Sequence, residues 1–197
     1  MKKDRFVAFF DAVMAIIMTI VVLEFVIPSG ATWADLNVFW FQLLAYALSF
    51  FWLGTMWINL HSVWNHVETV SRAILFVNMF TLFFSSMIPF FTVYMGRNIG
   101  EKVPQVLFGV DVMLIVLCNF ISTELLARKN TALKKRIKML RETYIIDELI
   151  KVIGIVIGIV LFPPTVMIST FVSVVFLAIV FSIRKRKYHK TAVSDAN

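Results

Sequence analysis

Five ionisable side chains lie inside long apolar runs of this 197-residue chain: Asp11, Glu24, His61, Asp111 and Glu124. Carboxylates and an imidazole can exchange protons, attract cations or pair with polar groups on neighbouring elements. Ionisable groups are costly in an apolar environment and are therefore rare there, which makes each of them a candidate functional residue. The chemistry that they suggest is proton or ion handling.

The spacing of these residues limits how they can pair. Arg5 and Asp11 are six residues apart, about 240° round a helix, so they cannot form a pair within one helix. Trp57 and His61 are four residues apart and share a helix face, so His61 can meet Asp11 or Arg5 from a second helix. Two interpretations stay open, namely a structural staple between helices and direct handling of protons or ions.

A second candidate is a stripe in the first apolar run. Ile16, Thr19, Ile20 and Leu23 follow helical spacing on one face, and Thr19 carries the only hydroxyl group on it. Such a stripe either packs against other helices or, around the axis of a symmetric oligomer, forms apolar rings that narrow a pore. Glu24 comes next, and it would form a carboxylate ring at the pore mouth or face outward at the headgroup level.

Other kinds of site are not indicated. Cys118 is the single cysteine, which excludes an internal disulfide and any multi-cysteine metal site. His61 and His66 are five residues apart with no carboxylate at ligand spacing, so no metal centre is expected. The sequence has no nucleophile elbow, His-x-x-x-His motif or Gly-rich phosphate loop, and we expect neither an enzyme nor a cofactor.

The elements that hold these residues are predicted by composition. Hydrophobic residues make up 60% of the chain, charged residues only 16%, and the mean hydropathy is +0.86. These values are typical of an integral membrane protein rather than a water-soluble domain. Counting runs of about 20 apolar residues predicts one all-α domain over residues 1–197 with six transmembrane helices. The predicted spans are about 6–27, 37–60, 72–95, 103–126, 149–162 and 164–183.

The last two predicted spans come from one apolar stretch that Pro163 and Pro164 divide, which indicates a tight turn. The fifth span is short, so it is either tilted or crosses only part of the membrane. Of the 19 Lys and Arg residues, 17 fall on the side of the two termini and 2 (Arg97 and Lys102) on the other. By the positive-inside rule both termini are cytoplasmic.

The basic segments Arg128 to Arg141 and Arg184 to Lys187 account for much of the net charge of +7. We interpret them as determinants of topology and as contacts with anionic lipid headgroups. No aromatic or groove-reading motif accompanies this charge, so nucleic acid is not an expected partner.

Several motifs resemble the transmembrane protein 175 family of potassium channels. Arg5-Phe-Val-Ala-Phe9-Phe10-Asp11 is similar to the R-x-x-x-F-S-D opening of that family. Further similar motifs follow in order: Tyr46-Ala-Leu-Ser49-Phe50, Trp57-Ile-Asn59-Leu-His61, Asn78, Leu82-Phe83 and Pro89-Phe90-Phe-Thr92. They cover roughly the first half of the chain. Two positions depart from the family pattern, because Phe10 replaces the usual Ser and Leu60 replaces a second His found in many members.

The resemblance implies a homotetrameric cation channel, selective for potassium over sodium, in the cell membrane of a prokaryote. It implies that the first helix lines the pore, with a constriction at Ile16 followed by Thr19, Ile20 and Leu23. It also implies that a polar network orients this helix, and the network comprises Arg5, Asp11, Trp57, His61 and Asn78. The Thr-Val-Gly-Tyr-Gly filter of ordinary potassium channels is absent from the family and from this sequence.

A carrier is the alternative from another functional class. Asp11, His61 and Glu124 could serve a small secondary transporter or proton-coupled carrier. We see no inverted repeat and no pair of broken helices of the kind that carriers use.

Overall fold

The computed structural model describes residues 3–64, 67, 70–129 and 134–194. The described residues form helices and connecting segments without any strand, which confirms the all-α prediction. The elements in chain order are α1 (Lys3–Ile20), η1 (Val21–Glu24), η2 (Ala34–Leu36), α2 (Asn37–Trp64), α3 (Arg72–Ser85), α4 (Ile88–Arg97), α5 (Lys102–Lys129), α6 (Lys134–Val160) and α7 (Thr165–Ser194).

Within the described residues, four helical segments are long and apolar enough to cross a membrane: Lys3–Glu24, Asn37–Trp64, Arg72–Arg97 and Lys102–Arg128. Thr165–Val180 is a shorter apolar helix. Helices suit hydrocarbon because they pair nearly every backbone N–H and C=O group within the segment, where no water is available.

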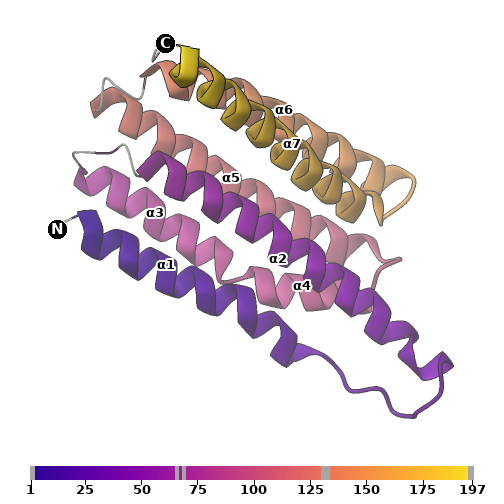
Figure 1. Ribbon diagram of the computed structural model, residues 1–197. Coiled ribbons are helices and arrows are strands. Elements are labelled where there is room, and N and C mark those ends of the chain that lie inside the picture. The colour runs from indigo at the N-terminus through magenta and orange to yellow at the C-terminus, as the bar shows by residue number, and fades with distance from the viewer. Residues whose placement is uncertain (1–2, 65–66, 68–69, 130–133, 195–197) are drawn as a thin grey trace.

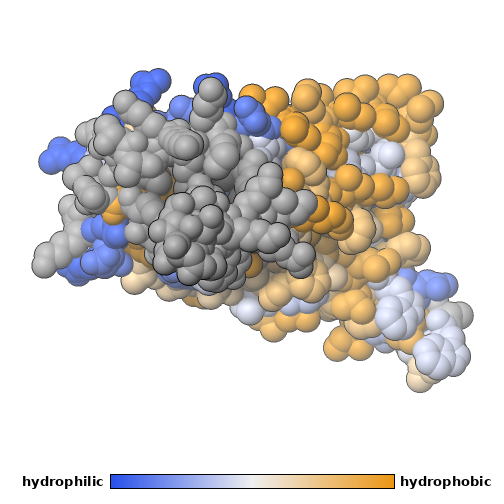
Figure 2. Space-filling view, turned by 45° about the horizontal axis from the view of Figure 1, so that its top comes forward, coloured by the Kyte–Doolittle hydropathy of each residue, from blue (hydrophilic) through white to orange (hydrophobic). Residues whose placement is uncertain are grey.

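Successive helices run in opposite directions along one bundle, with α3 and α4 together forming a single rod (Figure 1). The start of α1 and the end of α7 lie at the same end of this bundle. In Figure 2 hydrophobic residues cover the part of the surface away from that end, and hydrophilic residues gather towards it. Which side of the membrane this end faces stays a prediction.

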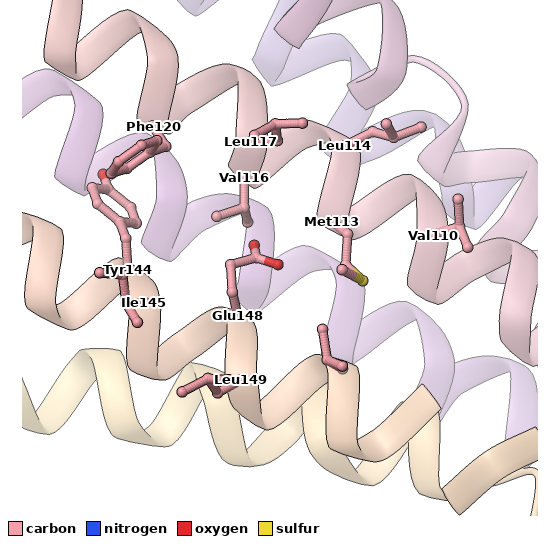
Figure 3. Close-up of a pocket in the computed structure, with 11 residues that line it drawn as sticks. Val110, Met113, Leu114, Val116, Leu117, Phe120, Tyr144, Ile145, Glu148 and Leu149 are labelled. Carbon is pink, nitrogen blue, oxygen red and sulfur yellow. The ribbon is translucent and has the colours of Figure 1, made fainter. Parts of the chain in front are cut away.

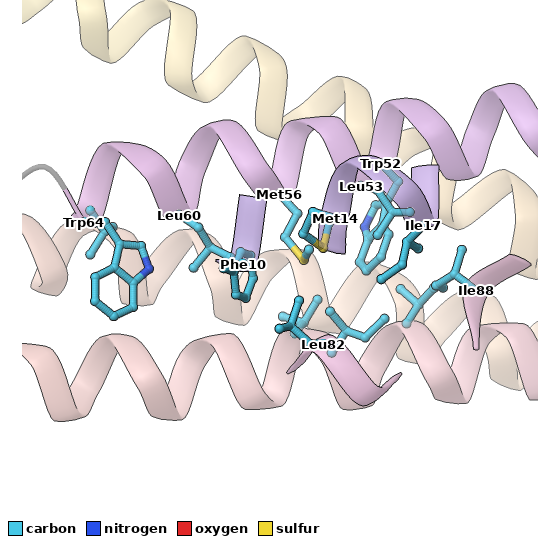
Figure 4. Close-up of a cluster of buried hydrophobic side chains, with 14 of the residues drawn as sticks. Phe10, Met14, Ile17, Trp52, Leu53, Met56, Leu60, Trp64, Leu82 and Ile88 are labelled. Atoms are coloured by element: carbon cyan, nitrogen blue, oxygen red, sulfur yellow. The ribbon is translucent and has the colours of Figure 1, made fainter. Parts of the chain in front are cut away.

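The core joins α1 and α2 to the α3–α4 rod (Figure 4). Phe10, Met14 and Ile17 of α1 are buried against Trp52 and Leu53 of α2, among further apolar side chains of the same cluster. These α1 residues recur every three or four positions, so they occupy one face of the helix. The opposite face of α1 remains outside the core.

The third predicted span is broken. The α-helical pattern stops at Ser85 and resumes at Ile88, with Pro89 in the first turn of α4. Proline has no N–H to donate and its ring clashes with the preceding turn, so a helix interior bends or breaks there. Ser86 closes α3 by donating its backbone N–H to Leu82 O at 2.9 Å and its hydroxyl to Phe83 O at 2.6 Å.

The helix that contains the fifth predicted span is longer than its apolar run. We expected 149–162, whereas α6 begins at Lys134 and includes charged residues such as Asp147 and Lys151. Both side chains are buried and paired, so they do not interrupt the helix. The side chains of residues 129–140 and 181–197 lie outside the described part of the structure, and with them most of the basic segments interpreted as lipid contacts.

Two glycines of α6 allow this helix to lie close to α7, which follows it after the turn at Pro163 and Pro164. Gly154 and Gly158 form a small-xxx-small pattern, which brings helix backbones together in membranes. A Cβ atom on Gly154 would lie 2.0 Å from Ser169 Oγ and 2.3 Å from Ser169 Cβ, and one on Gly158 would lie 2.8 Å from Val166 Cγ2.

The Gly154→Ala substitution should therefore destabilise the protein by about 1–3 kcal/mol, the usual range for overpacking. The check is the midpoint of thermal unfolding in detergent. Adding Ser169→Gly to Gly154→Ala should restore much of the loss, because it removes the two closest atoms that the new methyl group meets. Gly100→Ala is the matched control, since a Cβ there meets nothing within 4 Å. Equal midpoints for the Gly154 and Gly100 variants would contradict this account of α6–α7 packing.

Candidate functional site

The face of α1 opposite the core carries the predicted pore stripe. Ile16 is 61% exposed, Ile20 40% and Leu23 78%, and Thr19 between them is also exposed. Such exposure of large apolar side chains requires either lipid or another protein surface against them. The stripe therefore does not serve packing within a single chain.

Thr19 leaves its oxygen available on that face. Its hydroxyl lies 3.0 Å from Ala15 O and 3.1 Å from Ile16 O, and it donates to these carbonyl groups of its own helix. The oxygen lone pairs are not used by this bond, so they can accept a hydrogen bond from water or contact a cation.

The end of α1 tightens into the 3-10 helix η1, and the chain becomes extended at Phe25. The helix thus ends at Glu24, earlier than the predicted end at 27. In a 3-10 helix residues three apart eclipse each other, which keeps Leu23 on the same side as Ile20. Glu24 is exposed, and Arg97 Nη2 at the end of α4 donates to its backbone carbonyl at 3.1 Å. Arg97 thereby fastens the end of this helix to the rest of the bundle.

Three residues of the predicted polar network meet in a small cleft between α1 and α2. Trp57 Nε1 donates to Asp11 Oδ1 at 2.8 Å, and the rings of Trp57 and His61 have centroids 5.5 Å apart. All three side chains line the same cleft. Because Trp57 donates an N–H to the carboxylate, this contact fixes the rotation of α1 against α2 and hence the direction of the exposed stripe.

The structure places the other two network residues elsewhere. Asn78 is fully buried on α3 and donates from Nδ2 to Ser122 Oγ of α5 at 2.7 Å, so it joins a different pair of helices. Arg5 is exposed on α1, and its guanidinium has no hydrogen bond or ion pair with the described residues of the network.

The remaining ionisable candidates lie on α5, away from this cleft. Glu124 is half-buried and does not line the cleft of Asp11 and His61. Asp111 is buried, and its Oδ2 has no hydrogen-bond partner among the described residues. The three groups that a carrier mechanism would require are therefore not gathered in one described pocket.

Sequence reasoning missed a buried charged cluster that joins α6, α7 and α2. Lys151 and Asp147, each 2% exposed or less, form an ion pair one helical turn apart. Ser173 of α7 donates its hydroxyl to Asp147 Oδ1, and Lys151 Nζ lies 5.8 Å from the centre of the Trp52 ring on α2. The i,i+4 spacing of Asp147 and Lys151 was the available signal for this pair.

Comparison with known proteins gives the family. The model of the family described as endosomal/lysosomal potassium channel TMEM175 matches residues 5–89, which include most of α1 and all of α2 and α3. A potassium channel of Chryseobacterium sp. (strain P1-3) is 34% identical over 148 residues, 74% of this chain and 77% of that protein. The chain belongs to the TMEM175 family. A potassium channel of Streptomyces collinus is 34% identical over 104 residues, 51% of this chain and 50% of that protein.

The fold agrees with that of a solved TMEM175 relative. The crystal structure of a lysosomal potassium-selective channel TMEM175 homolog from Chamaesiphon minutus matches with a TM-score of 0.74. The match covers 90% of this chain and 96% of that one, at 21% sequence identity. With its apolar spans and bacterial relatives, the chain is a multi-pass membrane protein of the prokaryotic part of the TMEM175 family.

Membership in the TMEM175 family does not favour the carrier alternative, because the similar proteins are channels. The structure also accounts for one departure from the family motif. Phe10, which stands where the family usually has Ser, is buried in the α1–α2 core and its ring lies 6.2 Å from that of Phe6. Asp11 retains Trp57 as its donor without that hydroxyl.

The buried ion pair gives a prediction about stability. Lys151→Met should destabilise the protein by about 3–5 kcal/mol, because it leaves the Asp147 carboxylate buried without its cation. Adding Asp147→Leu should recover much of that loss, since no unpaired charge remains. Thermal unfolding in detergent measures both effects. Lys102→Met, at an exposed lysine, is the control and should change little. Equal losses for the single and double variants would show that the ion pair does not carry the effect.

Proposed function

We propose that four copies of this chain form a potassium-permeable channel in which α1 of each copy lies next to the central axis. The observation that carries this proposal is the exposed stripe of α1, in a chain whose family and curated relatives are described as potassium channels. The core-facing residues of the same helix are buried, so the stripe is the face of α1 that remains for contact with other copies.

Rings of Ile16, Ile20 and Leu23 narrow the proposed pore, and Thr19 offers hydroxyl oxygens to a partly hydrated ion. Apolar rings make passage depend on partial loss of water from the ion. Sodium holds its water more strongly than potassium, so the same rings penalise sodium more. Because apolar rings supply no replacement shell, the discrimination is modest compared with that of a carbonyl-lined filter.

Glu24 follows the last ring and is exposed. A ring of four carboxylates at this position would raise the local cation concentration by its field. The Asp11–Trp57 hydrogen bond sets the rotation of α1 and thereby keeps the apolar stripe, rather than its neighbours, towards the axis.

Substitution at the stripe tests the pore assignment. Ile16→Asn should wet the constriction, raise cation flux and lower the preference for potassium over sodium, as measured by flux into liposomes. Ile153→Asn is the matched control, since Ile153 is also an exposed isoleucine (57% against 61%) but lies on α6. The control should retain the flux and selectivity of the unmodified protein. Unchanged flux and selectivity in the Ile16 variant would exclude the stripe from the pore.

Cross-linking tests the assembly. In a Cys118→Ser background, Leu23→Cys should form disulfide-linked chains on mild oxidation, because the Leu23 side chains surround the axis. Phe80→Cys, at a 57% exposed position on α3, should stay unlinked. The mass of the uncross-linked particle in detergent, corrected for bound detergent, should equal four chains of 22.7 kDa. A monomeric mass, or equal linking at both positions, would overturn the assembly.

A further inference from the structure

A groove between α5 and α6 lies apart from the proposed pore. It has a volume of about 480 Å³, which falls in the range of small-molecule sites. Its walls include Met113, Val116 and Leu117 of α5 and Tyr144, Glu148 and Leu149 of α6. In Figure 1, α1 lies at one edge of the bundle and the α6–α7 hairpin at the other, so the groove is remote from the stripe.

Glu148 is the one ionisable carboxyl group among the residues that line this groove. Figure 3 shows its side chain reaching from α6 towards Val116 and Met113 of α5. Its Oε1 is buried and has no hydrogen-bond partner among the described residues. A buried carboxyl oxygen without a partner costs free energy, so the groove lacks a donor or cation at this point.

The nearest cation on the same helix already forms an ion pair with another carboxylate. Lys151 lies three residues after Glu148, a spacing that permits an ion pair, but it pairs with Asp147 instead. Lys151 is also held at the Trp52 ring of α2, and Ser173 of α7 donates to Asp147, so this cluster is directed to α2 and α7 and does not line the groove. The three charged residues 147, 148 and 151 thus include two carboxyl groups and one cation. Because the cation pairs with Asp147, the carboxyl group of Glu148 has no ion-pair partner among these three.

The groove opens onto an apolar part of the surface of the bundle. Its rim residues Leu117 and Leu149 are 51% and 54% exposed. By the rise of a helix, Glu148 lies about 20 Å from the hairpin turn that begins at Leu161, which is within the hydrocarbon thickness of about 30 Å. A ligand that reaches Glu148 by this route must be soluble in the bilayer.

We propose that this groove binds a cationic amphiphile of the primary alkylamine class. The ammonium group pairs with Glu148, and the alkyl chain lies between the apolar walls of α5 and α6. Charge complementarity selects this ligand, since a neutral chain fills the volume without supplying the missing donor and an anion is repelled. An alkylammonium group supplies three N–H donors and a positive charge to the carboxyl group.

Photolabelling tests this site independently of ion flux. The probe is tetradecylamine with a diazirine on its chain, added to the purified full-length protein in detergent, and labelled peptides are identified by mass spectrometry. Labels should fall on the segments 110–120 and 144–152. Unlabelled tetradecylamine should compete, whereas tetradecanol and tetradecyl sulfate should compete at least about tenfold more weakly, because they lack the charged contact.

Two variants and one control decide the outcome. Glu148→Gln should weaken competition by tetradecylamine at least about tenfold, while Glu142→Gln, at an exposed carboxylate of the same helix, should not. Leu117→Trp should fill the groove and abolish labelling, with thermal unfolding used to verify that each variant is folded. Equal competition by the amine and the alcohol, no effect of Glu148→Gln, or labelling elsewhere would overturn the proposal. A change of oligomeric mass in Leu117→Trp would also overturn it, because the groove would then be a contact between copies.

Discussion

The fold depends on polar contacts between helices, because lipid surrounds the bundle and offers neither water nor hydrogen bonds to buried polar groups. Lipid is as apolar as leucine, so burial of apolar side chains alone does not decide which helices meet. Polar contacts provide that information. Ser49 and Thr92 join α2 to α4 through hydroxyl groups 2.6 Å apart, and Asn78 joins α3 to Ser122 of α5. At the far edge of the bundle, Asp147 joins α6 to Ser173 of α7, and Lys151 lies over the Trp52 ring of α2.

The contacts of α1, the helix that faces the proposed axis, show how polar pairing positions a helix. Its inner face is held by apolar packing and by the hydrogen bond from Trp57 to the carboxylate of Asp11, and Lys3 at its start donates to Val67 O at 3.0 Å. Its C-terminal end is held by Arg97 at the carbonyl of Glu24, and by Gln42 Oε1, which accepts from the backbone N–H of Val26 at 3.2 Å. These contacts leave the stripe of Ile16 uncovered. A face that is kept free of its own chain is available to other copies.

Much of the architecture could be predicted because hydropathy and helical periodicity are properties of short segments. The apolar runs predict the helices, and the spacing of Ile16, Thr19 and Ile20 predicts one face that the structure leaves exposed. Partners across helices could not be predicted in the same way, because they depend on which helices are neighbours. Asn78 was therefore assigned to the network at Asp11 although it bonds to Ser122, and the pairing of Lys151 was overlooked. The polar contact that was anticipated, near Asp11 and His61, involves two consecutive helices, where adjacency follows from chain connectivity.

The break between Ser85 and Ile88 divides the support of the first helix. α1 contacts α3 and α4, and η1 contacts α4. α3 and α4 form one rod that a two-residue break at Ser86 and Met87 interrupts, so the first helix rests on segments from both sides of that break. Arg97 of α4 holds the carbonyl of Glu24 after that break, while Asn78 of α3 is held to Ser122 of α5 before it. The first helix is thus supported on both sides of a helix break, whereas a continuous supporting helix would transmit any tilt from one end to the other.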